Sequence, residues 1–151
     1  MVQITSQFSS TARLALCSRS PLPGAVDGAW WPKSADLRAE LPDLVAVIGL
    51  SIGRVHRVVY DPSLWPNAPS RVIRGTAVTA VDPYALVARD TIYLMGTHSR
   101  DAVLYVVPPA IPHAAVHRVL RAVSSATQSM SVAVLRQLVD RFAEAERSPT
   151  S

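Results

Sequence analysis

The chain has 151 residues, of which 49% are hydrophobic and 17% charged, and its formal net charge is +4. That length fits one domain with a sizeable buried core, and this composition excludes disorder of the whole chain. Cys17 is the only cysteine, which excludes an intrachain disulfide, and no segment has the pattern of a secretory signal or a membrane span. We therefore expect a cytoplasmic protein that does not associate with membranes.

The N-terminal elements are short and extended. Residues 1–9 are polar and are expected to be a flexible N-terminus, followed by a single domain over 10–146. Side chains alternate between apolar and polar over 11–17, which predicts a half-buried strand. A turn over 20–24 and a second extended segment over 29–32 follow, because proline punctuates both.

A helix is expected over 34–48. Ser34 is the expected N-cap, and Gly49 follows the last apolar residue of helical spacing, a position that glycine favours. Pro42 lies inside this span, so a kink or a restart is expected near Glu40. This is the one central helix of the predicted fold.

The middle of the chain is predicted to form strands. Residues 52–60 have the strongest strand signal, because β-branched residues are frequent there. Three prolines make 61–70 an irregular loop, and loops of that length are often functional. Four further strands are expected at 72–73, 77–81, 91–95 and 102–107, with a hairpin over 96–101 between the last two.

The C-terminal part is predicted to be helical. From Pro112 onward, apolar residues recur at helical spacing in two stripes, so we expect two helices, the second over 129–146, and a flexible tail at 147–151. The core of the domain is expected over 10–124. Together the elements predict an α+β fold: a mostly antiparallel sheet of five or six strands, one central helix, and C-terminal helices packed on one face.

Adjacent tryptophans mark the first candidate site. Trp30 and Trp31 stand between Gly28 and Pro32, and in an extended chain neighbouring side chains point to opposite faces. One tryptophan can therefore anchor the core while the other faces outward or lines a groove. Asp27 precedes them and has two interpretations: a general acid or base whose pKa burial raises, or a turn residue that caps backbone N–H groups.

A second candidate group lies on the strand that follows the central helix. Arg54, His56 and Tyr60 share one face of that strand and could bind an anionic ligand, although the solvated face of an ordinary sheet has the same composition. Arg57 lies on the opposite face. Trp65, in the next loop, is either a stacking platform for a base, a sugar or a proline, or a lid on the core.

Known catalytic and metal-binding patterns are missing from the sequence. His113 and His117 are four residues apart on a predicted helix, but no third ligand lies near them, so no metal and no cofactor is expected. There is no nucleophile motif and no glycine-rich phosphate loop. No catalytic residue is therefore assigned, and enzyme activity is not favoured.

The segment Asp27-Gly28-Ala29-Trp30-Trp31-Pro32-Lys33-Ser34 resembles a family of small uncharacterised actinobacterial proteins whose members carry a DGAWWP segment. Two later segments are similar to further patterns of that family: Val55-His56-Arg57-Val58-Val59-Tyr60-Asp61-Pro62 and Val106-Val107-Pro108-Pro109. The similarity covers residues 20–120. It implies membership of a family of unknown function and implies no reaction.

Three functions are open, in the order given. The first is a non-enzymatic binding or protein-interaction module that is homo-oligomeric through the C-terminal helix, because low charge leaves apolar surface to cover. The second is a small-molecule-binding protein or enzyme with a pocket between the Trp30-Trp31 segment and the 61–70 loop. The third is single-stranded nucleic-acid binding by arginines and Trp65, although an arginine-rich composition also follows from GC-rich coding.

Overall fold

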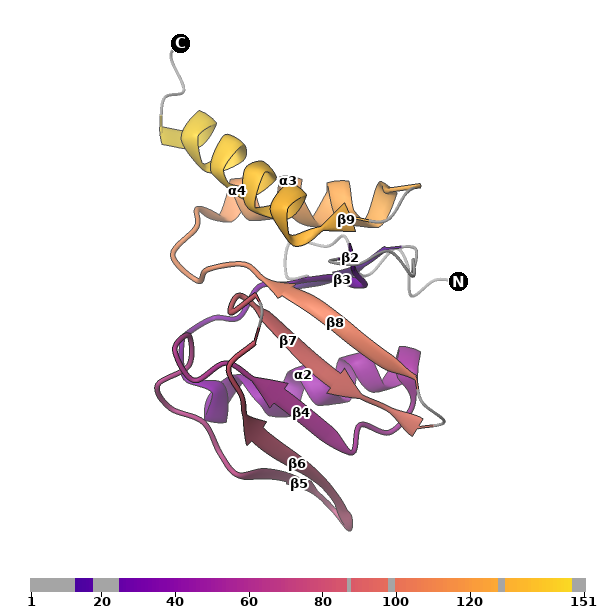
Figure 1. The fold of residues 1–151 in the computed structure, drawn as a ribbon. Helices are drawn as coiled ribbons and strands as arrows, with labels where there is room; N and C mark the ends of the chain where they lie inside the picture. Colours follow the sequence, from indigo (N-terminus) through magenta and orange to yellow (C-terminus); the bar gives the residue numbers. More distant parts are fainter. Residues whose placement is uncertain (1–12, 18–24, 87, 98–99, 128–129, 148–151) are drawn as a thin grey trace. The chain divides into compact units, whose positions relative to one another are not determined.

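The structure is a computed structural model that describes residues 13–17, 25–86, 88–97, 100–127 and 130–147 (Figure 1). Its internal contacts divide the chain into two compact units. The first unit combines Met1–Pro32 with Leu104–Ser151, and the second unit is Lys33–Val103.

The strands of the first unit pair in both directions. They are β1 (Leu14–Leu16), β2 (Ala25–Val26), β3 (Gly28–Trp30), the end of β8 (Asp101–Val106) and β9 (Met130–Ser131). β1 pairs antiparallel with β3, β3 pairs parallel with β8, and β2 and β9 form a separate antiparallel pair. A Cβ on Gly28 would collide with the carbonyl oxygen of Ala15, so the missing side chain lets β1 and β3 approach each other.

Two described helices complete the first unit. α3 (His113–Ser125) packs on β1 and β3, and α4 (Val132–Arg147) packs along α3 (Figure 1). Each buries one apolar stripe, formed by Ala115, Val116, Val119, Leu120 and Val123 on α3 and by Leu135, Val139 and Ala143 on α4. The second helix was expected from residue 129, but α4 begins at Val132 because Met130 and Ser131 pair with β2.

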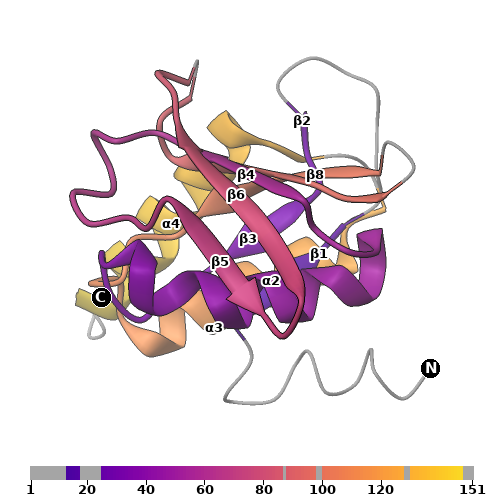
Figure 2. The same ribbon diagram turned by 90° about the horizontal axis from the view of Figure 1, so that it is seen from below.

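The second unit is a helix packed on a sheet. It contains α2 (Leu37–Ile52), β4 (Arg57–Tyr60), β5 (Arg71–Arg74), β6 (Ala77–Pro83) and β7 (Thr91–Met95). β4 pairs parallel with β6 and antiparallel with β7, and β5 pairs antiparallel with β6. α2 lies along one face of these strands (Figure 2). The core between the layers includes Leu37, Leu41, Leu44, Ile48 and Ile52 of α2, and Val58, Val72, Val81, Ile92 and Leu94 of the strands.

The expected start of the central helix was wrong. Asp36 is the N-cap of α2, and its carboxylate accepts a 3.1 Å hydrogen bond from the N–H of Arg38. The hydroxyl of Ser34 instead donates to the carboxylate of Glu40, at 2.9 Å. Because that contact holds Ser34 against the outside of the first turn, the helix begins later than predicted. It also runs through Pro42 without a restart.

The strand expected over 52–60 was correct only in its second half. α2 continues past Gly49 to Ile52, whose side chain is buried, and Gly53 then turns the chain with a φ of 81°. β4 therefore begins only at Arg57. A short run of β-branched residues fits the buried end of a helix as well as a strand, so the pattern alone could not separate the two.

The remaining strand predictions are close to the structure. The four short strands predicted between residues 72 and 107 are confirmed as β5 to β8, and the strand expected over 11–17 contains β1. Residues 11 and 12, the turn over 20–24 and the flexible segment 1–9 lie outside the described residues. So does the tail beyond Arg147, which is itself the last residue of α4.

The fold is α+β as predicted, but the sheet is mixed. The described strands form a seven-stranded sheet in the order β1-β3-β8-β7-β4-β6-β5, together with the two-stranded sheet β2-β9, where a mostly antiparallel sheet of five or six strands was expected. Both parallel pairs join strands that are distant in the chain. Side-chain alternation reports which face a residue occupies and not the direction of its partner strand, so these pairs could not be predicted.

The helices also differ from the expected arrangement. α2 lies in the second unit whereas α3 and α4 lie in the first, so the expectation of one central helix is not matched. In the part of the chain that the structure describes, no helix is long and apolar enough to cross a membrane. The boundary of a single domain over 10–146 stays a prediction.

Candidate functional site

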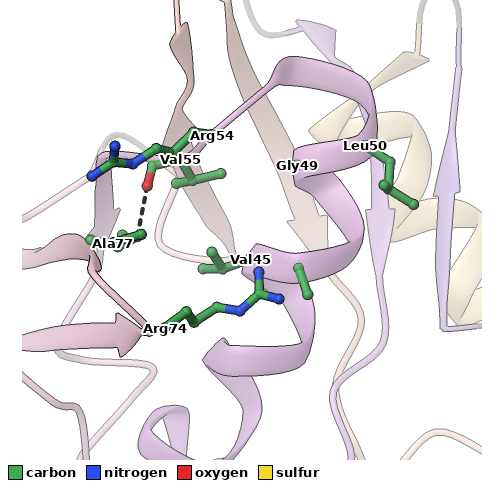
Figure 3. A pocket seen from close by; sticks show the side chains of 9 residues that line it. Val45, Gly49, Leu50, Arg54, Val55, Arg74 and Ala77 are labelled. Carbon is green, nitrogen blue, oxygen red and sulfur yellow. Dashed lines mark hydrogen bonds between the residues drawn. The ribbon is translucent and has the colours of Figure 1, made fainter.

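A pocket lies between α2 and the β5–β6 hairpin of the second unit (Figure 3). Its volume is about 320 Å³, at the lower end of the roughly 300–1,000 Å³ that small-molecule sites occupy. We call it the α2 pocket. Its lining residues are Val45, Ala46, Gly49, Leu50, Arg54, Val55, Arg74, Ala77 and Thr79.

The walls of the α2 pocket are largely aliphatic. Gly49 contributes open space, because a Cβ built there would meet no atom within 4 Å. The hydroxyl of Thr79 donates a 2.6 Å hydrogen bond to the carbonyl of Val55, drawn as a dashed line in Figure 3. Since the protein itself uses this hydroxyl proton, the wall offers a ligand mainly apolar contact.

Two arginines supply the charge of the α2 pocket. Arg54 follows the end of α2, and Arg74 is the last residue of β5. In Figure 3 the guanidinium of Arg74 reaches toward α2 beside Val45, and that of Arg54 extends on the side of Ala77. Neither guanidinium has a hydrogen bond or an ion pair with any residue that the structure describes. A guanidinium in this state keeps its N–H donors for a carboxylate or a phosphate.

Gly53 sets the position of Arg54. Its backbone angles, φ 81° and ψ −171°, lie in a region that glycine adopts almost alone. Its N–H donates a 3.0 Å hydrogen bond to the carbonyl of Gly49, and the carbonyl of Arg54 accepts a 3.4 Å bond from the hydroxyl of Thr97. The backbone at the pocket is therefore held at both residues while the Arg54 side chain is left available.

The predicted row of Arg54, His56 and Tyr60 does not form one site. Arg54 lines the α2 pocket, whereas His56 is exposed and Tyr60 is buried in β4. Arg57 points elsewhere and forms a 2.7 Å ion pair with Asp82 at the surface. Because β4 starts only at Arg57, the alternation assumed from residue 54 does not apply before it.

The loop over 61–70 is held by Asp61. Its carboxylate accepts hydrogen bonds from the hydroxyl and the N–H of Ser63, at 2.7 and 2.9 Å, and from the N–H of Leu86, at 3.0 Å. These donors, led by the Ser63 hydroxyl, hold the pKa of Asp61 below its usual value. Trp65 in the same loop is 2% exposed, which agrees with a lid on the core and not with a surface platform.

In the first unit, Trp30 and Trp31 are both buried, at 5% and 6% exposure. The guanidinium of Arg13 lies 4.2 Å from the centroid of the Trp31 ring. The His113 ring lies 5.4 Å from the same ring and 4.2 Å from that of His117. No group of three or more possible metal ligands occurs among the described residues. The outward-facing tryptophan that the alternation suggested is therefore covered by a cation and an imidazole.

Asp27 and Cys17 lie near each other in the first unit. Asp27 occupies the bend between β2 and β3, and its carbonyl accepts a 2.9 Å hydrogen bond from the N–H of Cys17. The thiol of Cys17 donates to the carbonyl of Val26 at 3.3 Å. Burial, with the charge of Asp27 adding to it, raises the pKa of the Cys17 thiol. A thiol that stays protonated is a poor nucleophile, so this pair has no catalytic geometry.

Sequence reasoning identified Arg54 but missed the rest of the α2 pocket. Arg74 precedes Gly75-Thr76, a two-residue turn, and pairs with Ala77 across the hairpin. Glycine between two strand patterns is the signal that could have placed Arg74 and Ala77 opposite each other. Nothing in the local pattern indicates that this hairpin lies beside α2.

A family model described as a family of unknown function, DUF5994, matches residues 13–123. The match includes every residue of the α2 pocket and agrees with the resemblance expected over residues 20–120. No curated protein and no solved structure matches the chain. The functional argument therefore depends on the geometry of the pocket.

Proposed function

The chain belongs to DUF5994, a family of unknown function, and we propose from the α2 pocket that it is a non-enzymatic binding protein. Its ligand carries a carboxylate on an aliphatic body. The observation that carries the proposal is the pair of arginines, Arg54 and Arg74, which line an aliphatic pocket without an acidic partner among the described residues.

The chemistry of the lining supports binding of an anion. An arginine needs no partner at an open surface, but two at one pocket repel each other and together favour a negative charge between them. Val45, Val55 and Ala77 add apolar surface that a purely inorganic anion would not use. A ligand with a charged end and an aliphatic end satisfies both parts of the lining.

The composition of the lining supports binding over catalysis. Its nine residues include no carboxylate, imidazole or thiol, the groups that most often transfer protons or attack a substrate. The one hydroxyl, on Thr79, is bonded to the carbonyl of Val55. Residues that line the pocket can therefore hold and orient a ligand, which is the activity that we propose.

Two further expectations keep less support. Self-association through the C-terminal helix stays a prediction, but Leu135, Val139 and Ala143 are buried in the first unit, which leaves Val134 as the exposed large apolar residue of α4. Single-stranded nucleic-acid binding loses the exposed tryptophan on which it depended, since Trp65 is buried. A cytoplasmic location stays a prediction.

Titration with hexanoate, followed by backbone amide chemical shifts, tests the proposal. We expect shifts at the residues of the α2 pocket and binding that weakens as salt is added. Arg54→Ala and Arg74→Ala should each weaken binding by about tenfold, the loss expected for one charge-assisted contact. Hexanol, which keeps the aliphatic body without the charge, should bind much more weakly.

Arg38→Ala is the matched control. Arg38 is an exposed arginine of α2 that does not line the pocket, so its removal changes the net charge of the protein equally. Binding that falls equally in Arg38→Ala would indicate a general charge effect. Equal shifts with hexanol and hexanoate would overturn the proposal.

A further inference from the structure

The edge of the sheet in the second unit is open at β5. Among the described strands β5 is the last in the order, with β6 on its one paired side. The carbonyl of Ser70 accepts a 3.0 Å hydrogen bond from the N–H of Val81, which makes Ser70 and Val81 a hydrogen-bonded pair of the β5–β6 ladder. Such pairs alternate along an antiparallel ladder, so the N–H and C=O groups of Arg71 and Ile73 point away from β6.

This open edge adjoins the α2 pocket. Val72 and Arg74 alternate with Arg71 and Ile73, and Arg74 is both the last residue of β5 and part of the pocket lining. Ile73 is 59% exposed, as is uncommon for isoleucine in a strand. An extended chain added along β5 would therefore pair with its free backbone groups, cover Ile73 and end at the pocket.

The lining of the pocket restricts which part of an extended chain can end there. Aspartate and glutamate bring a carboxylate on a short stem, whereas the last residue of a polypeptide brings a free α-carboxylate together with a whole side chain. An aliphatic C-terminal residue thus matches both the arginines and the aliphatic walls formed by residues such as Val45 and Val55.

We propose that the α2 pocket and the outer edge of β5 together bind the C-terminus of a partner polypeptide whose last residue is aliphatic. The partner segment adds as an extra strand to β5, and its α-carboxylate lies between Arg54 and Arg74. Because the carboxyl end lies beside Arg74, at the end of β5, the added strand runs parallel to β5. This inference rests on the proposed function, whose carboxylate site it uses.

Charge complementarity favours this occupant. Arg71 and Arg74 stand at the two ends of β5, and neither has an ion-pair partner among the described residues. Charged side chains on an edge strand also discourage pairing between copies of the same chain, because like charges would then meet. The same arginines admit a segment that is negatively charged at its carboxyl end, so they select a partner and disfavour self-pairing.

The probe is the pentapeptide acetyl-Thr-Lys-Thr-Val-Leu with a free carboxylate, compared with the same peptide amidated and with amidated acetyl-Thr-Lys-Thr-Val-Glu. We expect the free acid to bind, and both amidated peptides to bind about tenfold or more weakly, the effect of losing a charge-assisted contact. Binding should also slow hydrogen exchange of the amides of Arg71 and Ile73 in the wild-type protein. If the glutamate peptide bound as well as the free acid, the site would read an acidic side chain and the proposal would be overturned.

Ile73→Pro separates the edge from the pocket. It removes one outward N–H without removing a bond to β6, which edge strands tolerate, and Ile73→Thr is the control that keeps this N–H. Ile73→Pro should weaken the peptide about tenfold, the expected effect of blocking strand addition, and leave hexanoate binding unchanged.

The outcomes distinguish the two proposals. Hexanoate binding without peptide binding, or peptide binding without protection of the Arg71 and Ile73 amides, overturns the strand addition and leaves the proposed function standing. Loss of both ligands overturns both. The exchange measurement uses the wild-type protein, so the proposal remains testable even if the proline variant does not fold.

Discussion

Arg13 and Trp31 hold each other through three contacts. The guanidinium of Arg13 lies 4.2 Å from the centroid of the Trp31 ring and donates a 3.1 Å hydrogen bond to the carbonyl of Trp31. The N–H of Trp31 in turn donates to the carbonyl of Arg13, at 2.7 Å. The indole Nε1 of Trp31 is buried with no hydrogen-bond partner among the described residues, so the arginine contacts are the main polar compensation for burying this residue.

Arg13→Ala is expected to lower the free energy of unfolding by about 1 kcal/mol, the usual size of a partly desolvated cation–π contact or a hydrogen bond. Arg13→Lys keeps the charge but not the planar group, so it should recover only part of that loss. Urea unfolding followed by circular dichroism measures both variants. Arg38→Ala, an exposed arginine, should change the stability by far less. Equal effects at positions 13 and 38 would contradict the role of the stacking.

The tryptophan pair shows how far the sequence could predict this arrangement. The extended backbone of residues 29–32 could be predicted, because it follows from local proline geometry. The partners of Trp31 could not, since Arg13 lies 18 residues away and His113 comes from α3. Burial of both tryptophans is set by these distant residues and not by the alternation of their own strand.

The α2 pocket divides in the same way. Arg54 could be selected from the sequence because arginine near a β-branched run is a visible anion donor. Arg74 could not, because its relation to Arg54 depends on the parallel pairing of β4 with β6, which brings the hairpin alongside α2. Pairing of strands distant in the chain is a tertiary property that side-chain periodicity does not encode.

Gly53→Ala is expected to destabilise the protein by about 1–3 kcal/mol, the cost of a non-glycine residue in this backbone region. A Cβ at this position would also lie 2.5 Å from the hydroxyl oxygen of Thr97. Because Gly53 positions Arg54, the variant should bind hexanoate more weakly than the wild type even under conditions where it is folded. Thermal unfolding and the hexanoate titration measure the two effects.

Gly75→Ala is the matched control for Gly53→Ala. Gly75 also has a positive φ, 62°, but a Cβ there would meet no atom within 4 Å. It should therefore cost about 1 kcal/mol from backbone strain alone. Adding Thr97→Ala to Gly53→Ala should recover the part of the loss due to the close contact. Equal losses at the two glycines, with no recovery, would refute the contact at Thr97.

Asp61→Asn is expected to destabilise the second unit in a pH-dependent way. The donors from Ser63 and Leu86 favour the charged carboxylate, so the folded-state pKa of Asp61 lies below its unfolded value. Its contribution to stability is therefore fully present above the unfolded pKa, about 3.9, and is lost as the pH falls through the lower folded value. The difference between wild type and Asp61→Asn should be large at neutral pH and shrink in acid. Urea unfolding at several pH values measures it. Ser63→Ala, which removes the strongest donor, should reduce the wild-type advantage, and a difference that stayed constant with pH would contradict the assignment to Asp61.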